Sequence, residues 1–500
     1  MVKINLVVIL LLCTVSINSE HRQSIKSWND HVNRHLSRGV EKFAAALNKA
    51  IDANRIKDDN KNVVFSPLNV VGLLAVMLLG SEGKSNETLC SFGFNNDQVI
   101  SKDSEFLHHM FGNLINSIQS GNEASRVKIP ELVSANRIFV QNGYSIRPNY
   151  AAFIRDVYNY NVTQVDFHDS FVTKDTINNW IKSASRGKIN NLLQEPPSDL
   201  TEILIASTLH FKGQWKYPFS EEETKRQPFY LESGKTVEVD MMKINNQFLY
   251  GSFPRHSTRH FRGTPALGAD IVGLPYKVQT VDGSKSEVTM FIVLPHPDVP
   301  LSEILSRFTR HNIEYYLDYT MIFYDCTVEL PKMKLSSTLN LRDTLQSLGF
   351  TSMFNPKSAN LGLMSTGRSK SFTDEPLNIS KIRTENLNNE EDLSSPANFQ
   401  EYVKTKNFSS YGLDELRESK NFDNPSLHVT RADHKVEIDI SERDTEAAAV
   451  AHMVVSYRSN QYTPVFVKCN RPFLLLIRHE PSGLISFWGD VRKPTPSYEQ

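Results

Sequence analysis

The stretch SERDTEAAAVAHMVVSYRSNQ, residues 441–461, raises the first structural question of this sequence. Small side chains fill its first half, an apolar run follows, and a basic residue, Arg458, stands near its end. In a strand, alternate residues across 445–455 would share one face that is first small and then apolar. Because no proline occurs within 442–463, every backbone N–H there can join a sheet. The stretch is therefore suited to enter a sheet between two existing strands.

A helix is the alternative for the same residues. Alanine has the highest intrinsic helix propensity, and Thr445 is an acceptable N-cap before the alanines. The β-branched pair Val454 and Val455 and the strand-like neighbours argue against a long helix. A helix formed before the segment enters a sheet would not conflict with a strand afterwards.

The whole chain has the composition of an ordinary globular protein. Its 500 residues are 40% hydrophobic and 22% charged, with a formal net charge of -1. The length allows one large domain or two ordinary ones. The charge balance gives no sign of a nucleic-acid partner.

The N-terminus predicts secretion. Residues 1–19 contain Lys3, a short apolar run and small residues up to Ser19, where we expect a signal peptide to be cleaved. The alternative is a membrane anchor, but the apolar run is too short to span a bilayer comfortably. We therefore expect an extracellular protein with no membrane association, whose mature domain covers residues 20–500.

Cysteines and sequons fit the same compartment. The mature chain keeps the three cysteines Cys90, Cys326 and Cys469, so at most one internal disulfide can form, and buried thiols are the favoured interpretation. Four Asn-X-Ser/Thr sequons predict glycans on exposed loops. Their asparagines are Asn86, Asn161, Asn378 and Asn407.

Helical periodicity dominates the first third of the chain, and strand patterns dominate the rest, which indicates the α+β class. Residues 366–424 are polar and poor in aliphatic side chains, and we interpret them as a solvated, partly disordered insertion. A second polar stretch, residues 254–263, is basic and sits between strand-like runs. It is either an ordinary solvated loop or a hairpin tip that binds a sulfated polysaccharide through Arg255, His256, Arg259, His260 and Arg262.

Catalytic and metal motifs are not found. His108 and His109 lack a third ligand at metal spacing, so ordinary surface histidines are the favoured interpretation. Neither a G-x-S-x-G elbow nor an H-E-x-x-H helix occurs. We therefore predict no metal site; the absence of catalytic motifs argues against an enzyme without excluding one.

Several motifs in order resemble the serpins, the serine protease inhibitor superfamily. They are NVVFSPLNV, INNWIKSASRGKI, LHFKGQW, VEVDMM, VGLPY, IVLP, VELPKMKL, LQSLGF, VKCNRPFLLLIRH and FWGDVRKP. The resemblance covers most of the mature chain, and residues 366–424 have no counterpart in it. It implies a single domain of about nine helices and three β-sheets, with an exposed reactive-centre loop.

The resemblance also implies that residues 441–464 are the hinge and the reactive-centre loop. The hinge would comprise Glu442, Asp444, Thr445, Glu446, Ala447, Ala448 and Ala449. Counting Glu442 as the first position, the usual seventeenth position is Arg458, so Arg458–Ser459 is the expected reactive bond. A basic side chain there suits the acidic primary pocket of a trypsin-like protease.

Family positions beneath the main sheet correspond to Ser66, Asn69, Ser207 and His434, and the tryptophan where the loop enters corresponds to Trp215. The family usually has serine where this chain has Asn69, and asparagine where it has Ser207. If the two side chains face each other across the sheet opening, the exchange keeps the same donors and acceptors. We expect a compensated swap.

The implied activity is suicide inhibition of a trypsin-like protease by a monomer, in an extracellular cascade of the clotting, innate-immunity or melanisation type. The chain would be a substrate that traps its protease, not an enzyme, and no cofactor is expected. If residues 254–263 bind a sulfated polysaccharide, that polysaccharide would act as an activator. The family hinge usually has glycine where this chain has Asp444, and a charge there would slow insertion. The alternative is therefore a non-inhibitory serpin that acts as a carrier or binding protein.

Overall fold

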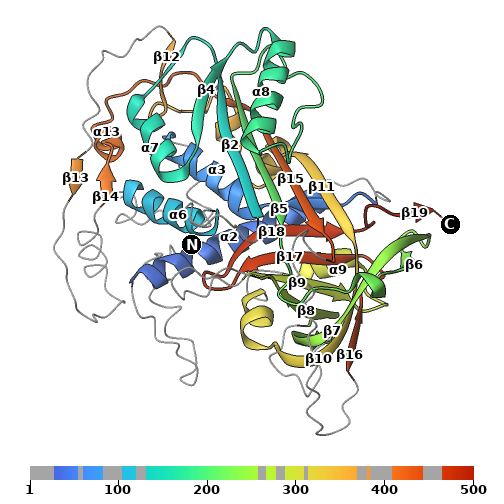
Figure 1. Cartoon of the computed structure of the whole chain (residues 1–500). Helices are drawn as coiled ribbons and strands as arrows, with labels where there is room; N and C mark the ends of the chain where they lie inside the picture. The colour runs from blue at the N-terminus through green and yellow to red at the C-terminus, as the bar shows by residue number, and fades with distance from the viewer. Residues whose placement is uncertain are drawn as a thin grey trace.

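The computed structural model describes residues 28–53, 60–82, 104–119, 131–256, 266–277, 288–308, 313–368, 380–382, 408–442 and 464–499. The signal peptide, the reactive bond and the hinge beyond Glu442 lie outside these ranges. Figure 1 shows a mixed α+β body in which helices gather around one end of a sheet and further strands form the other end. The α+β class is thereby confirmed.

The first sheet has five strands in the order β11-β15-β5-β2-β4. Their bounds are β11 Met333–Asn340, β15 Val429–Ile440, β5 Ile203–Lys212, β2 Glu131–Gln141 and β4 Asn161–Val165. Strand β15 pairs with β5 in parallel, whereas β2 pairs with β5 in the antiparallel sense. The neighbouring inner strands β15 and β5 are buried along nearly their whole length.

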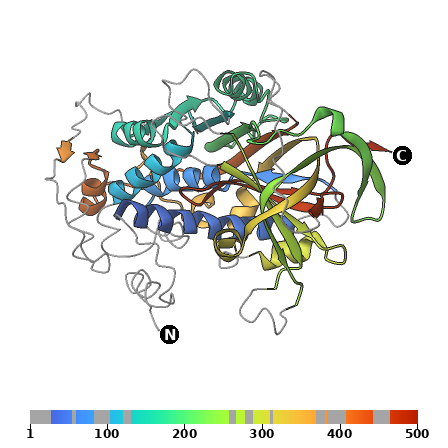
Figure 2. The ribbon, with the colours of Figure 1, turned by 60° about the horizontal axis from the view of Figure 1, so that its bottom comes forward.

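Helices cover both faces of this sheet. They are α2 Trp28–Ala53, α3 Pro67–Leu79, α6 Ser104–Gln119, α7 Pro148–Tyr158 and α8 Ser170–Ala184. Ile203 and Ile205 belong to the core that α2 and α3 fill, while Leu204 packs with Ile177 of α8 in a separate core. Since side chains alternate along a strand, α3 and α8 lie on opposite faces. Figure 2 shows α2 and α3 side by side, with α8 farther away.

The second sheet has ten strands in the order β1-β18-β17-β9-β8-β7-β10-β16, with β6 and β19 also paired to β7. Their bounds are β1 Val63–Phe65, β6 Lys225–Tyr230, β7 Thr236–Phe253, β8 Ala269–Pro275, β9 Val288–Pro295, β10 Ile322–Pro331, β16 Val465–Lys468, β17 Phe473–His479, β18 Leu484–Val491 and β19 Tyr498–Glu499. Strand β7 is 18 residues long and bonds to β10 and β8 over different stretches. It therefore joins two of the three expected sheets into one hydrogen-bonded surface.

Shorter elements complete the described fold. They are β3 Tyr144–Ile146 paired with β12 Ser365–Arg368, β13 Ser380–Ile382 paired with β14 Phe408–Ser410, α9 Leu301–Arg307, α11 Arg342–Ser347, α13 Leu413–Ser419, the 3-10 turns η1 Glu221–Glu223 and η4 Ser352–Phe354, and the π-turn η3 Tyr315–Tyr319. None of the described helices combines the length and the apolar character that a membrane crossing needs.

The polar segment 366–424 is part of the fold where it is described. Tyr411 is 5% exposed and Leu413 is fully buried in the helical core. A solvated insertion is therefore the wrong interpretation for these two residues. The pattern missed them because two buried side chains barely change the composition of a long polar stretch.

Two of the three mature cysteines are described, and both are free and buried. Cys326 lies opposite Val465 in the β10–β16 pair, while Cys469 follows the end of β16, so the thiols are several residues apart along neighbouring strands. Burial raises the pKa of Cys326 to about 11 and that of Cys469 to about 12, which keeps both thiols protonated and inert. Cys90 lies outside the described residues.

Candidate functional site: the opening of the five-stranded sheet

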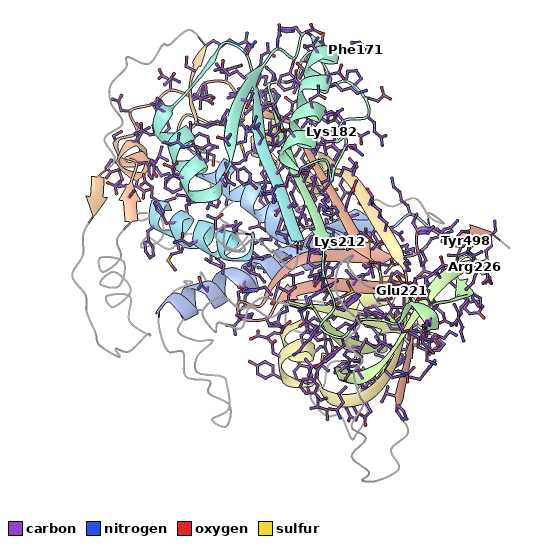
Figure 3. The ribbon with its side chains drawn as sticks, in the orientation of Figure 1. Phe171, Lys182, Lys212, Glu221, Arg226 and Tyr498 are labelled. Atoms are coloured by element: carbon purple, nitrogen blue, oxygen red, sulfur yellow. The ribbon has the colours of Figure 1, made fainter. Side chains whose placement is uncertain are left out.

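The seam between β5 and β15 is the candidate site. The strands are paired from Val429↔Ile203 to Asp439↔Lys212, so no other strand lies between them. Figure 3 labels Lys212 at the end of β5, and β15 ends beside it at Ile440. A chain that turns back from this end would run antiparallel to both strands. Parallel pairing is slightly weaker than antiparallel pairing, so a strand entering here would replace one weak ladder with two stronger ones.

Trp215 fixes the start of the hinge at the mouth of this seam. Its indole Nε1–H donates to the carbonyl oxygen of Ser441 at 2.8 Å. Its ring stacks on Tyr276 with a centroid separation of 4.5 Å and an interplanar angle of 10°. Gly213 permits this stack, because a Cβ at that position would lie 2.5 Å from the Tyr276 ring. Trp215 thus lies beside the end of β15, and its role at the entrance of the loop stays a prediction.

Glu442 is the last described residue of the predicted hinge, and the side chains of Lys332 and Thr224 hold it. Its Oε2 lies 2.8 Å from Lys332 Nζ, and its Oε1 accepts a hydrogen bond from Thr224 Oγ1 at 2.9 Å. Burial raises the pKa of Glu442, but the hydrogen bonds from Lys332, its own backbone N–H and Thr224 outweigh burial and hold that pKa below its usual value. Glu442 is thus an anchored carboxylate at the hinge.

A hydrogen-bonded cluster lies beneath the seam around His434. The backbone N–H of Ser66 donates to His434 Nε2 at 2.9 Å, and His434 Nδ1 lies 3.3 Å from Ser207 Oγ. Burial lowers the pKa of His434 to about 4, so the ring is neutral at pH 7. Because Nε2 accepts, Nδ1 carries the proton and donates to Ser207. This contact crosses the seam from β15 to β5, so any separation of the two strands would break it.

Asn69 connects the same cluster to β2 and β5. Its backbone N–H donates to Ser66 Oγ at 3.2 Å, which caps α3 as the sequence predicted. Its Nδ2 donates to Ser134 Oγ at 3.0 Å and to the Thr208 carbonyl at 3.4 Å. Asn69 therefore bonds beside Ser207, to the main chain of the next residue. The compensated swap stays a prediction.

Several residues of the site escaped sequence reasoning. They are Thr224, Tyr276 and Lys332 at the mouth of the seam and Ser134, Asn136 and Thr208 in the cluster beneath it. Asn136 Nδ2 donates to Ser134 Oγ at 2.9 Å, so β2 contributes a second amide beside Asn69. Lys332 belongs to the motif VELPKMKL, but no neighbouring residue in the sequence indicates that Glu442 is its partner.

The basic stretch 254–263 is described only at its start. Arg255 lies 2.7 Å from Glu303 and 3.4 Å from Asp298, so carboxylates already neutralise its charge. His256 is exposed. Arg259, His260 and Arg262 lie outside the described residues.

The remaining predicted residues divide in the same way. Of the four sequon asparagines, Asn161 begins the edge strand β4 and is half-buried, and the structure does not describe Asn86, Asn378 and Asn407. The described residues also exclude residues 444–449, Arg458 and Ser459. His108 is 2% exposed and its Nδ1 lies 2.7 Å from Tyr158 OH, so the interpretation of His108 as an ordinary surface histidine is wrong. Across the ranges that the structure describes, no three His, Cys, Asp or Glu side chains are grouped to hold a metal.

Comparison with known proteins assigns the family. The model described as Serpin (serine protease inhibitor) matches residues 38–494, and this chain belongs to the serpin family. It is 26% identical to antithrombin-III of Mus musculus over 92% of this chain and 82% of that protein. It is 28% identical to glia-derived nexin of Mus musculus over 87% of this chain and 88% of that protein.

Solved structures agree on the fold. The crystal structure of mouse protein-Z-dependent protease inhibitor superposes with a TM-score of 0.69 at 20% identity, covering 94% of this chain and 100% of that one. Native protease nexin-1 with heparin superposes with a TM-score of 0.67 at 22% identity, covering 93% and 99%. The resemblance read from the sequence is confirmed.

Proposed function

We propose that this chain is a secreted inhibitor of trypsin-like serine proteases that traps its target after cleavage at Arg458–Ser459. The observation that carries the proposal is the closed parallel seam between β5 and β15, with the hinge anchored at its mouth by Trp215 and Glu442. A small-faced, proline-free segment follows directly. A receiving site and a segment suited to enter it are thus joined in one chain.

The chemistry is that of an acyl transfer that stops half-way. The protease serine attacks the carbonyl carbon of Arg458, the bond to the Ser459 nitrogen breaks, and the new amine takes a proton. Arg458 is then held to the protease as an ester. The freed hinge enters the seam as a strand antiparallel to β5 and β15 and carries the protease with it. Distortion of the protease prevents water from completing the hydrolysis.

The energetic argument follows from the hydrogen-bond pattern. Entry breaks the parallel ladder and the His434–Ser207 contact, but it forms two antiparallel ladders along the inserted strand. Small side chains at the hinge reduce the steric cost of parting the sheet. The uncleaved folded protein then has a higher free energy than the cleaved protein with the inserted strand, and cleavage allows the change.

Incubation with trypsin tests the proposal. We expect an SDS-stable complex, a new N-terminus at Ser459 and a gain in heat stability of the cleaved serpin. Arg458→Ala should abolish trypsin trapping, and Arg458→Lys is the matched control that keeps a cleavable basic side chain. Persistent trapping by Arg458→Ala would identify another reactive bond.

The second candidate is a non-inhibitory carrier, and the charge of Asp444 in the hinge favours it. Under that reading trypsin cleaves the chain cleanly and no complex forms. Asp444→Gly separates the two readings, because it should increase the fraction of trapped protease if the charge alone slows insertion. A variant that still fails to trap would support the carrier function.

Secretion, glycosylation at the four sequons and a role in a proteolytic cascade belong to the same proposal. So does activation by a sulfated polysaccharide, which the similarity to protease nexin-1 solved with heparin supports. The pairing of Arg255 with Glu303 leaves Arg259 and Arg262 as the main cationic contributors. Charge reversal of both should remove any acceleration by heparin.

A further inference from the structure

An apolar surface lies at the start of β10. Ten large apolar side chains are exposed among the described residues, and five of them are in or beside the β10–β16 pair. These five are Tyr319, Ile322, Phe323, Tyr324 and Phe466, which we name the β10-end patch; Phe323 is 71% exposed. Half of the exposed large apolar side chains thus lie in or beside one strand pair. Phe323 and Phe466, which lies opposite Thr327, are on one face of β10, and Ile322 and Tyr324 are on the other.

The patch exists because β10 runs past the end of the core beneath it. Ile322 and Tyr324 are on the same face of the strand as Cys326 and Val328, which are buried. Within the described part of the chain, β16 pairs with β10 only from Cys326 onward. Exposed strand ends usually carry charges that discourage contacts, but residues 322–325 include only one charge.

The surroundings have the composition of a protein interface. On the neighbouring strand β7, Asn245 Oδ1 accepts a hydrogen bond from Thr327 Oγ1 at 2.6 Å, and Gln247 lies opposite Asp325 in the strand register. These side chains form a polar rim next to aromatic and aliphatic ones. Interfaces commonly place aromatic anchors inside a polar border, and exposed apolar patches on soluble monomers often mark binding sites.

The patch lies at the end of the molecule to which the reactive bond is tethered. Strands β10 and β16 are parallel, so both begin at the same end, at the bottom of Figure 1. Arg458 precedes Val465 by seven residues, and seven extended residues span at most about 25 Å. A protease domain of about 240 residues is roughly 45 Å across. A protease that holds Arg458 is therefore close enough to contact the patch.

We propose that the β10-end patch is a docking surface for the protease held at Arg458, and that it contacts an apolar area beside that protease's active site. The inference rests on the proposed function and adds a determinant of which trypsin-like proteases are inhibited fastest. The tether favours this occupant over a second copy of the chain. Binding at Arg458 converts the second contact into an intramolecular one at millimolar effective concentration.

Paired variants at opposite ends of the molecule test the proposal. Phe323→Asn removes the most exposed side chain of the patch, and Phe171→Asn is the matched control, with 73% exposure at the far end in Figure 3. The measurement is the second-order rate constant for SDS-stable complex formation with trypsin, thrombin and a plasminogen activator. A synthetic peptide of residues 450–466, cleaved by the same enzymes, gives the contribution of the loop alone.

We expect Phe323→Asn to slow complex formation about tenfold with at least one enzyme, as for an aromatic anchor, with the peptide rate and the control variant unchanged. Tyr319→Asn is the second variant, and thermal melts confirm that each variant folds. Unchanged rates with all three enzymes overturn the inference. So does a wild-type dimer in sedimentation that Phe323→Asn converts to monomer at unchanged rates.

Failure of the proposed function is recognised separately. If wild type is cleaved at Arg458 without forming a complex, inhibition is disproved. The rate of that cleavage then replaces the rate of complex formation. A cleavage rate that falls in Phe323→Asn and not in Phe171→Asn still supports the docking surface, and equal cleavage rates still overturn it.

Discussion

The seam between β5 and β15 and the contact between α6 and residues 408–419 are both buried and polar, yet their bonds differ. Across the seam, His434 reaches Ser207 at 3.3 Å. We name residues 408–419 the docked segment. Glu105 of α6 accepts hydrogen bonds from the backbone N–H groups of Tyr411 and Leu413 in this segment, at 2.8 and 2.6 Å. One region uses a long neutral contact and the other uses short bonds to a carboxylate.

The docked segment also accepts a hydrogen bond from α6. Asp414 accepts the backbone N–H of Glu105 at 2.9 Å, so each carboxylate satisfies backbone groups of the other element. Arg417 then reaches Asp414 at 3.0 Å and the Leu79 carbonyl at 3.2 Å. Charge-assisted bonds are about twice as strong as neutral ones. The comparison agrees with the proposal that the seam opens, and we infer that the docked segment stays closed.

The variant with the largest expected effect disrupts the contact between α6 and the docked segment. Glu105→Ala leaves two buried backbone N–H groups without an acceptor, and we expect it to lower the free energy of unfolding by about 4 kcal/mol. Urea denaturation measures the loss, and Glu415→Ala, an exposed carboxylate on α13, is the control. The number of serpin molecules consumed per trapped protease should not change. A change in that ratio would show that the docked segment takes part in opening.

The second prediction uses pH to separate the regions. His434 has a pKa of about 4 in the folded state against about 6.5 unfolded, so the unfolded chain binds more protons between these values. Stability from His434 is therefore complete above pH 6.5 and falls by roughly 3 kcal/mol as the pH drops to 4. His434→Gln should flatten this acid loss without abolishing it, because burial also lowers the pKa of His108 and of His479.

Asp414 in the docked segment contributes a pH dependence of stability opposite in sign to that of His434. Burial raises its pKa to about 7, above the unfolded value of about 3.9, so its contribution to stability is complete in acid and is lost as the pH rises toward 7. Asp414→Asn should therefore steepen the acid loss that His434→Gln flattens. Unfolding free energies measured from pH 4 to 7.5 test both signs. Parallel curves for the two variants would contradict the assignment.

Much of this arrangement was predictable from local sequence. Ser66 before Pro67 indicates a capped helix, and the motif around Trp215 predicts a tryptophan at the loop entrance. The partners across the fold were not predictable. Glu105 and Asp414 are 309 residues apart, and the topology alone brings them together. The same holds for the exposed start of β10, whose apolar residues predicted a strand but not where the core beneath it ends.

The third prediction concerns the mouth of the seam. Lys332→Ala leaves the Glu442 carboxylate, whose side chain is 6% exposed, without its cation. Because the side chain of Lys332 is 47% exposed and screened by solvent, we expect a loss of only about 1–2 kcal/mol. The loosened hinge should also shorten the half-life of the uncleaved inhibitor at elevated temperature. Lys334→Ala, two residues along the same face, is the control and should leave that half-life unchanged.

The smallest expected effect is the coupling between Asn69 and Ser207. Asn69 Nδ2 reaches the Thr208 carbonyl at 3.4 Å, directly beside Ser207, whose hydroxyl faces His434. Asn69→Ser removes the amide donor to β5, and Ser207→Asn supplies an amide from the β5 side. The double variant should therefore be about 1 kcal/mol more stable than the sum of the single variants predicts.

Urea denaturation of the four proteins of this cycle gives the coupling, and the rate of protease trapping shows whether the seam still opens. Strict additivity would mean that the two sites satisfy their neighbours independently. The asparagine and the serine would then be separate features of the cluster, and the exchange would not be compensated. A positive coupling with unchanged trapping would show that the seam keeps the same balance of donors and acceptors whichever strand or helix carries the amide.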